Sequence, residues 1–319
     1  MPAQSRCARL RSLAKLNLSL LVLHKRPDGF HELRTVFQTI SLADELDIEF
    51  TPGRTRAIEL ASEIDIPDNL VVRAASLLMD ELKIRGRVRF RLTKTIPMGG
   101  GLGGGSSNAA AVLLALPVLA GVPSNLPKLA ALATRLGSDV PFFLYGGTAL
   151  GIGRGTELYP LPELPERPAL VVASGIHVST PDAYRALNRG LTAEAMPAIM
   201  SSLQGFVWRG GNAAPAGAWD CSNDFETVVF RQHPLLGTIK RKLKRAGASP
   251  ALMTGSGSAM FGVFDSVANR DRARALFARE RVYPVKLVSR RGYRELWWRQ
   301  LKDHIAERKW PPQSRYLMK

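Results

Sequence analysis

The chain has 319 residues, enough for roughly two domains, and its 45% hydrophobic and 22% charged residues are typical of a soluble globular protein. Its 44 Lys and Arg against 27 Asp and Glu give a formal net charge of +17, which favours anionic partners without choosing among them. The two cysteines, Cys7 and Cys221, exclude a disulfide framework and a thiolate metal site. They fit a reducing compartment, so we expect a cytoplasmic protein.

The amino-terminal segment predicts a strand. Four basic residues precede the apolar run 16–23, as in a secretory signal, but Asn17 and Ser19 interrupt the run and no small-residue cleavage site follows it. Apolar residues recur there close to period two. We therefore predict a strand ending near Leu23, no membrane span, and a hairpin turn at residues 26–29, where Pro-Asp-Gly favours a tight turn.

The patterns that follow predict a mixture of helices and strands. Period-two or short apolar runs predict strands at 35–40, 45–50, 87–95 and 169–173, and helical periodicity predicts helices at 69–83, 109–119, 126–136, 181–188 and 234–246. The Pro-rich stretch 159–167 predicts a domain boundary, and the Gly- and Ala-rich stretch 205–218 predicts a surface loop. We expect an α/β (α+β) fold with domains at 1–160 and 161–289 and a basic, Trp-containing extension at 290–319.

A glycine-rich loop lies between the strand at 87–95 and the helix at 109–119. After Pro97 it holds six glycines in seven positions, followed by two serines: Gly99, Gly100, Gly101, Leu102, Gly103, Gly104, Gly105, Ser106 and Ser107. Exposed backbone N–H groups beside a helix N-terminus favour phosphate. A flexible linker is the alternative, but linkers seldom carry a leucine among the glycines and Ser-Ser-Asn after them. The loop therefore predicts a phosphate site.

Two common phosphate loops differ from this one. A Walker A loop needs Lys before its Ser or Thr, and here no Lys precedes Ser106. A Rossmann pattern matches at Gly99, Gly101 and Gly104, but it needs an acidic residue about 20 positions further on, where Ser124 and its neighbours are neutral. A dinucleotide oxidoreductase is therefore a weaker alternative.

The loop resembles that of the GHMP kinase superfamily, Pro-x3-Gly-Leu-Gly-Ser/Gly-Ser-Ser. Five further segments, from about residue 13 to about 265, are similar to one branch of this superfamily, which phosphorylates a cytidine-diphosphate sugar alcohol. They are Ala14-Lys15-Leu16-Asn17-Leu18, Arg26-Pro27-Asp28-Gly29-Phe30-His31-Glu32-Leu33, Leu136-Gly137-Ser138-Asp139-Val140-Pro141-Phe142-Phe143, Asn223-Asp224-Phe225-Glu226 and Met253-Thr254-Gly255-Ser256-Gly257-Ser258.

The resemblance implies a two-domain GHMP kinase fold with its active site in the cleft between the domains. Asp139 would be the general base that takes the acceptor's hydroxyl proton, and Lys15 beside it would offset charge on the transferring group. Taken alone, Asp139 reads as a helix N-cap and Lys15 as a solvated charge. Only the combination of motifs favours the catalytic reading.

The resemblance also assigns the acceptor site. His31 would hydrogen-bond the cytosine edge, with Phe30 and Tyr184 stacked on its ring, while Asn17 and Thr180 would contact the acceptor. An ordinary hairpin is the alternative for Phe30 and His31. Phe30 stands where this branch usually has Tyr, which keeps the stacking face.

On the nucleotide side, the resemblance places Asn69 and Lys94 near adenosine and the backbone from Gly101 to Ser107 around the phosphates, with Pro97, Gly99 and Gly100 also among the ATP-binding residues. A second glycine loop, with Gly255, Ser256 and Gly257, would close on the acceptor phosphates, or else be an ordinary turn. Thr254 replaces the more usual Ser there. Mg²⁺ is expected with ATP because phosphoryl transfer needs charge neutralisation, although the sequence identifies no metal ligands.

The resemblance thus implies ATP-dependent phosphorylation of the 2-hydroxyl of cytidine-diphosphate methylerythritol, a small-molecule substrate of the non-mevalonate isoprenoid pathway. Another GHMP small-molecule kinase is the alternative. A nucleic-acid-binding protein is a weaker one, suggested by nine basic and three acidic residues from Arg290 to Lys319. That tail extends beyond the family pattern and predicts either a docked amphipathic helix or a contact for anionic surfaces. We expect no nucleic-acid partner, and the oligomeric state is not predicted.

Overall fold

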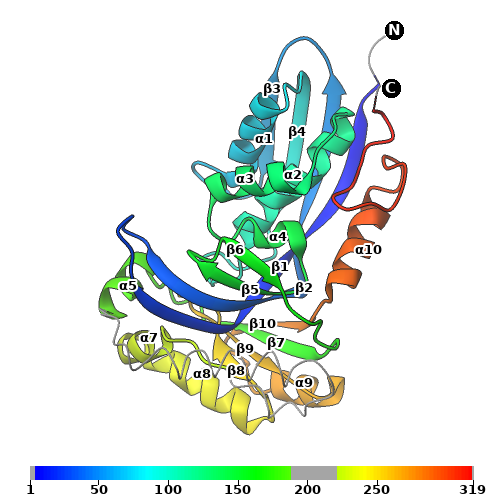
Figure 1. Ribbon diagram of the computed structural model, residues 1–319. Coiled ribbons are helices and arrows are strands. Elements are labelled where there is room, and N and C mark those ends of the chain that lie inside the picture. The colour runs from blue at the N-terminus through cyan, green and yellow to red at the C-terminus, as the bar shows by residue number, and fades with distance from the viewer. Residues whose placement is uncertain (1–3, 188–220, 318–319) are drawn as a thin grey trace.

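The computed structural model describes residues 4–187 and 221–317 of the chain. Two long antiparallel strands, β1 (Arg6–Lys25) and β2 (His31–Pro52), run through the molecule and pair with each other (Figure 1). One edge of β2 pairs with β1, and its other edge pairs with β5 (Thr148–Gly153) at residues 33–38 and with β4 (Gly86–Thr93) at residues 45–52. Strands β3 (Ala57–Ser62) and β6 (Glu157–Pro160) complete a six-stranded sheet.

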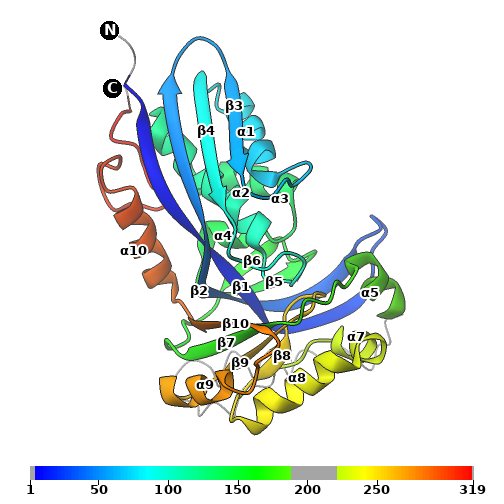
Figure 2. The ribbon, with the colours of Figure 1, turned by 180° about the vertical axis from the view of Figure 1, so that it is seen from behind.

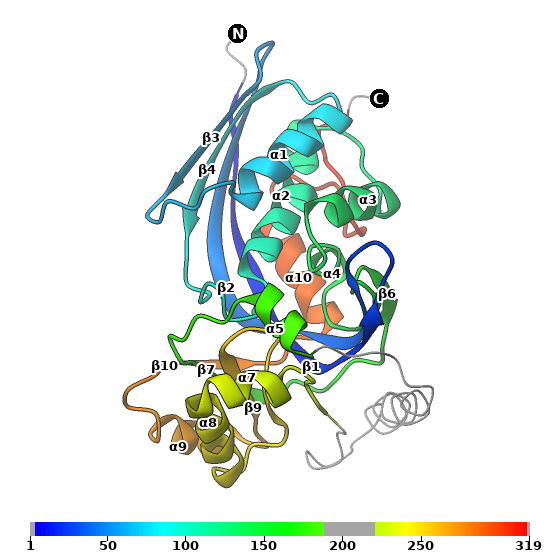
Figure 3. The same cartoon turned by 90° about the vertical axis from the view of Figure 1, so that its left-hand side faces the viewer.

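Helices cover one face of this sheet (Figure 3). They are α1 (Leu70–Glu81), α2 (Gly104–Ala120), α3 (Leu126–Leu136) and the short α4 (Phe142–Tyr145). Every residue of α2 from Ser107 to Leu119 is buried, and eleven of these thirteen are apolar or proline. A helix that is apolar on all sides is typical of a protein core. Packing therefore holds α2 in place, and with it the end of the glycine loop.

The second half of the chain forms a four-stranded antiparallel sheet of β7 (Pro168–Ala173), β8 (Ala251–Met253), β9 (Ala259–Val263) and β10 (Arg281–Lys286). One face packs on the helices α5 (Thr180–Leu187), α7 (Glu226–Gln232), α8 (Pro234–Arg245) and α9 (Val267–Arg274). The other face packs on β1 and β2, where Leu16 and Ile40 join Phe261 in one core. The two long strands therefore belong to both halves of the molecule.

The carboxy-terminal segment returns to the first sheet. Helix α10 (Arg290–Gln300) lies alongside β1 (Figure 2), and its Tyr293 and Trp297 are buried in the core that α2 and α4 also share. The Tyr293 hydroxyl donates to the carbonyl oxygen of Phe143 at 2.5 Å, and Trp310 Nε1 donates to that of Leu144 at 3.0 Å. Of the two readings of this tail, the docked helix is confirmed.

Most predicted elements are present, with changed limits. The predicted strands 35–40 and 45–50 are parts of the single strand β2, and the first strand begins at Arg6 instead of near residue 16. The helix predicted from Ala109 begins at Gly104, inside the glycine loop. The turn at residues 26–29 is confirmed, with Gly29 at φ +84° and its N–H bonded to the Arg26 carbonyl at 3.1 Å. The predicted loop at 205–218 lies outside the described residues.

No helix of the described residues is long and apolar enough to cross a membrane. The predicted domain limits, including the boundary at 159–167, stay a prediction, although residues 161–167 do connect the first sheet to the second.

Candidate active site

The first part of the site is a cavity of about 310 Å³ above the start of α2. Ile66, Leu70 and Leu92 give it an apolar side. It brings together almost all the residues predicted to bind ATP: Asn69, Lys94, Pro97, Gly99, Gly100, Gly101, Leu102, Gly103, Gly104, Gly105 and Ser106. The Asn69 side chain also caps α1, since its Oδ1 accepts from the Val71 N–H at 3.0 Å.

Ser107 is the exception among these residues. Its N–H donates to the carbonyl of Gly103 at 2.8 Å, because the helix has already begun, and its hydroxyl donates to the carbonyl of Leu13 at 2.7 Å. The side chain is buried and lines neither cavity of the site. Ser107 thus joins α2 to β1 by a hydrogen bond. Its position does not support the predicted contact with phosphate.

The second part of the site is a cavity of about 660 Å³ that adjoins the first, with Gly101 and Ser106 lining both. It gathers the residues predicted for catalysis and for the acceptor: Lys15, Asn17, Phe30, His31, Asp139, Thr180 and Tyr184, with Gly255 and Ser256 of the second glycine loop. These residues come from β1, β2, α5 and three loops, so only the tertiary fold brings them together.

Lys15 and Asp139 form an ion pair in the larger cavity, with Lys15 Nζ 3.3 Å from Asp139 Oδ2. Lys15 also lies beside the first glycine loop, because a Cβ at Gly103 would be 3.0 Å from its Cγ. The Lys15 side chain is 3% exposed and that of Asp139 is 35% exposed. Asp139 lies in the turn between α3 and α4, and Lys15 follows a register shift in β1 after Leu13. At that shift the backbone N–H of Lys15 donates to the carbonyl of Leu102 at 3.0 Å. This hydrogen bond joins the strand that carries the Lys15 ammonium directly to the glycine loop.

Asn17 orients Lys15 within a buried hydrogen-bond network. Its Oδ1 accepts from Lys15 Nζ at 2.6 Å, and its Nδ2 donates to Thr35 Oγ1 at 2.7 Å. The hydroxyl of Thr254 lies 3.3 Å from the same Oδ1 and 3.1 Å from the carbonyl oxygen of Gly101. A network whose members are all bonded holds its side chains in one arrangement. Lys15 is therefore positioned before any ligand arrives.

Aromatic rings line part of the larger cavity. His31 stacks on Tyr184 with ring centroids 4.5 Å apart and an interplanar angle of 22°, and Phe225 meets Tyr184 edge-on. Phe30 lies apart from this stack, 50% exposed, with the Arg154 guanidinium 4.3 Å from its ring centroid. The structure therefore brings His31 and Tyr184 into direct contact, and Phe30 stands at the rim.

Burial sets the charge of these rings. It lowers the pKa of His31, with Lys25 and His24 adding to the effect, so the imidazole is neutral near pH 7 and offers one donor and one acceptor. Burial also raises the pKa of Tyr184 to about 12, helped by the carboxylate of Asp139. Tyr184 is therefore a neutral phenol over the pH range in which enzymes usually work.

The second glycine loop packs directly on the first. A Cβ at Gly257 would lie 2.6 Å from the backbone atoms of Gly99, Gly100 and Gly101, and a Cβ at Gly101, where φ is +76°, would lie 2.1 Å from the Thr254 carbonyl. Gly257 lines neither cavity, so its predicted contact with acceptor phosphates is not supported by the geometry. It lets the two loops approach each other.

We expect Gly257→Ala to raise KM for ATP by about tenfold or more, because the added methyl must push the first loop away from its phosphate-binding position. Steady-state kinetics with varied ATP would measure this. Gly237→Ala in α8 is the matched control, since a Cβ there meets its nearest neighbours at an ordinary 3.6 Å. A Gly257→Ala enzyme with an unchanged KM would show that the loop contact does not matter for ATP.

Several residues of the site carried no signal in the sequence. Lys25, Arg154 and Arg185 add three cations to the larger cavity, and Thr35 supports Asn17. Each is an ordinary residue of a strand, turn or helix, and nothing in its local pattern separates it from a surface charge or a strand threonine. Arg154 lies in a turn between Gly153 and Gly155, and these two glycines are the one local feature that marks its position.

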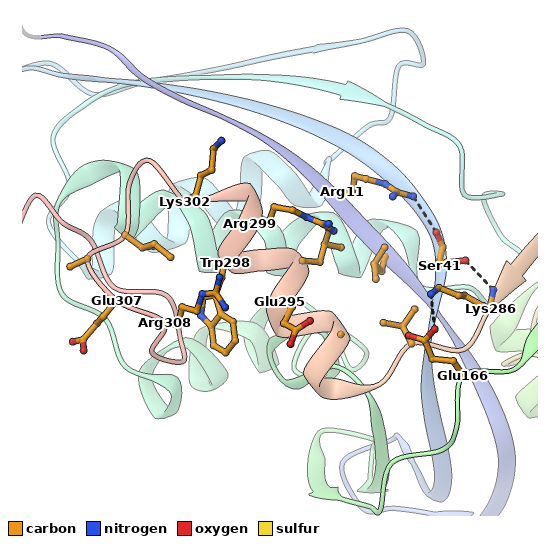
Figure 4. A pocket seen from close by; sticks show the side chains of 16 residues that line it. Arg11, Ser41, Glu166, Lys286, Glu295, Trp298, Arg299, Lys302, Glu307 and Arg308 are labelled. Carbon is orange, nitrogen blue, oxygen red and sulfur yellow. Dashed lines mark hydrogen bonds and ion pairs between the residues drawn. The ribbon is translucent and has the colours of Figure 1, made fainter.

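A third cavity, of about 700 Å³, lies between α10 and the long strands (Figure 4). Arg11 and Ser41 line it from the strands, and Trp298 and Arg299 line it from α10. It shares no lining residue with the two cavities above and does not belong to this site.

Within the described residues, no group of three or more His, Cys, Asp or Glu side chains could hold a metal ion. Mg²⁺ in kinases is usually held by one or two protein oxygens together with substrate phosphates and waters. The Ser106 hydroxyl and the Asp139 carboxylate, both lining the larger cavity, fit such a partial ligand set. The residues present are thus compatible with Mg²⁺ that arrives with the nucleotide.

Comparison with known proteins places this site in a family. The GHMP kinases N terminal domain matches residues 69–147, and the GHMP kinases C terminal domain matches residues 209–282. A curated relative from Solibacter usitatus, named 4-diphosphocytidyl-2-C-methyl-D-erythritol kinase, is 57% identical over 316 residues, 98% of both chains. This chain belongs to the 4-diphosphocytidyl-2-C-methyl-D-erythritol kinase family of the GHMP kinases.

Further relatives and solved structures match shorter parts of this chain. The relative from Pelotomaculum thermopropionicum is 43% identical and covers 84% of this chain, while 92% of its own length is matched. A crystal structure of 4-(cytidine 5'-diphospho)-2C-methyl-D-erythritol kinase superposes with a TM-score of 0.72 at 37% identity, covering 88% of this chain and 98% of that one. Homoserine kinase from Cytophaga hutchinsonii, at 19% identity and a TM-score of 0.71, shares the fold. The chain is thus a kinase with the GHMP fold, and ATP is its phosphoryl donor as a member of this family.

Proposed function

We propose that this chain transfers the γ-phosphoryl group of ATP to the 2-hydroxyl of 4-diphosphocytidyl-2-C-methyl-D-erythritol. One observation carries the proposal: the Lys15–Asp139 pair, 3.3 Å apart, lines an aromatic, cation-lined cavity that shares Gly101 and Ser106 with the adjoining glycine-lined cavity. A donor phosphate in the glycine-lined cavity and an acceptor alcohol in the aromatic one would meet at this pair. The family membership supports the identity of the acceptor.

In this proposal Asp139 is the general base. Its partly exposed carboxylate faces the acceptor cavity and would accept the proton of the hydroxyl as the phosphoryl group transfers. Lys15, held by Asn17, would stabilise the negative charge on the transferring group. Mg²⁺ bound with ATP would neutralise charge on the phosphates. Backbone N–H groups from Gly99 to Ser106, beside the α2 N-terminus, would bind those phosphates.

The acceptor cavity suits a cytidine diphosphate. Neutral His31 would pair with the cytosine edge through one donor and one acceptor, and the rings of Tyr184 and Phe30 would flank the base. Because His31 now stacks on Tyr184, these two rings would have to separate before Tyr184 could flank the base and His31 could pair with its edge. Lys25, Arg154 and Arg185 would attract the diphosphate. The cysteine content supports a place for this reaction in the cytoplasm.

A coupled assay of ADP release across several alcohols tests the proposal. We expect turnover with ATP, Mg²⁺ and 4-diphosphocytidyl-2-C-methyl-D-erythritol, and turnover lower by at least about two orders of magnitude with homoserine or mevalonate, because these leave the base-binding groups unpaired. The phosphorylated position would be read by ³¹P and ¹H NMR of the product. Equal turnover on homoserine or mevalonate would reassign the acceptor.

A further inference from the structure

Asp44 lies on β2 within residues 39–44, the short stretch between the segments that pair with β5 and with β4. Its side chain is fully buried, at 0% exposure. The next residue, Glu45, pairs with Thr93 at the end of β4. Asp44 therefore stands where β4 leaves the sheet and the chain turns toward the glycine loop.

The Asp44 carboxylate accepts hydrogen bonds from four groups there. Its Oδ1 accepts from the N–H groups of Thr95 and Ile96, both at 2.8 Å. Its Oδ2 accepts from Asn108 Nδ2 at 2.9 Å and forms an ion pair with Lys94 Nζ. A carboxylate is stable in a protein interior when it is paired and hydrogen-bonded in this way.

Two of the four groups bonded to Asp44 line the nucleotide cavity, and the other two lead into the glycine loop. Lys94 and Asn108 line that cavity, and Thr95 and Ile96 lead directly into Pro97 and the glycine loop. The Lys94 side chain is only 7% exposed, and a Cβ at Gly104 would lie 3.0 Å from its Nζ. The ammonium is thus enclosed beside the first turn of α2. Among the described residues, Asp44 is its one ion-pair partner.

We propose that Asp44 is a positioning residue for the nucleotide, which fixes Lys94 and joins the end of β4 to α2 so that the glycine loop keeps its phosphate-binding shape. Asp44 lines neither cavity, so it acts through these groups and not by contact with ATP. The proposal rests on the function proposed above for the adjoining cavity. It goes beyond that function because it assigns Asp44 an effect on the binding of ATP and no effect on the binding of the acceptor.

Asp44→Asn tests this directly. The amide keeps the shape of the side chain and one oxygen for the two backbone N–H groups, but it loses the charge that holds Lys94. We expect KM for ATP to rise about 10- to 100-fold, with kcat and KM for the acceptor within about twofold of the wild type. Asp47→Asn is the matched control on the same strand, because the Asp47 carboxylate forms an exposed pair with Arg9 at 2.7 Å and should not change either KM.

Binding of ADP alone, measured by calorimetry, keeps this test independent of the acceptor. We expect ADP to bind Asp44→Asn about 10- to 100-fold more weakly, even if the wild-type enzyme proves to act on another alcohol. Unchanged ADP affinity overturns the proposal. So does an equal loss of affinity for both substrates, which would mean a general structural role.

A second comparison covers the case in which Asp44→Asn does not fold. Lys94→Met removes the enclosed ammonium, so adding Asp44→Asn to it should change ADP affinity by less than about threefold. A further tenfold loss, or failure of the double variant to fold, would overturn the proposal, since Asp44 would then support the domain by other means.

Discussion

Asp139→Asn is expected to lower kcat by about 10²- to 10⁴-fold with little change in KM for either substrate, because a general base acts in the transition state. The amide is close to the carboxylate in shape and can still fill the space beside Lys15, which lies 3.3 Å away. It has no basic oxygen to accept the proton. Steady-state kinetics with each substrate varied in turn would measure the effect.

Asp265→Asn serves as the control for this change, because its carboxylate pairs with Arg167 at 2.8 Å and neither of these residues lines either cavity. It should leave kcat unchanged. An Asp139→Asn enzyme that retains a third or more of its kcat would show that proton removal does not depend on this carboxylate. A raised KM with normal kcat would instead give Asp139 a role in binding.

Trp297→Ala is expected to lower the free energy of unfolding by about 3–5 kcal/mol, the usual cost of truncating a buried tryptophan. The Trp297 side chain is 1% exposed, and its ring lies edge-on to that of Tyr293 with centroids 6.4 Å apart. Both rings belong to the core that includes Phe142 and Phe143 of α4. Urea unfolding followed by circular dichroism would give the difference.

The neighbouring Trp298→Ala makes a close control. Trp298 is half-buried beside the third cavity, and its Nε1 donates to the carbonyl of Lys309 at 3.1 Å. Its removal should lower stability by less than about 1.5 kcal/mol. If the two substitutions cost the same, α10 would not be part of the core.

The sequence predicted the parts of the site that depend on local chemistry. The glycine loop, the turn at 26–29 and α3 could be located because glycine, proline and capping residues act over a few positions. The single strand β2 was divided in two because its residues are buried on both faces near residue 40, which removes the alternation that predicts a strand. Strand β3 was missed, since none of its six residues is fully buried and Glu59 and Ala61 are exposed.

The groups that support the site could not be predicted in this way. Asp44 is one acidic residue in an apolar strand, and only the fold shows that four donors meet its carboxylate. The basic, Trp-containing tail allowed two interpretations because α10 has two different sides. Its basic residues suggested a contact for anionic surfaces, while Tyr293 and Trp297 form the side that is buried against the body of the protein. Ser107 and Gly257 matched family motifs, yet each makes a packing contact between elements.

The continuity of β1 and β2 limits how this enzyme can move. A kinase whose halves are joined by one flexible connection can close by a hinge rotation. Here a rotation of one half against the other would have to bend two paired strands of 20 and 22 residues, which are packed in both cores. Ligand entry and product release must therefore depend on smaller pieces attached to a stiff frame, such as the hairpin tip at Phe30 and helix α5 with Tyr184.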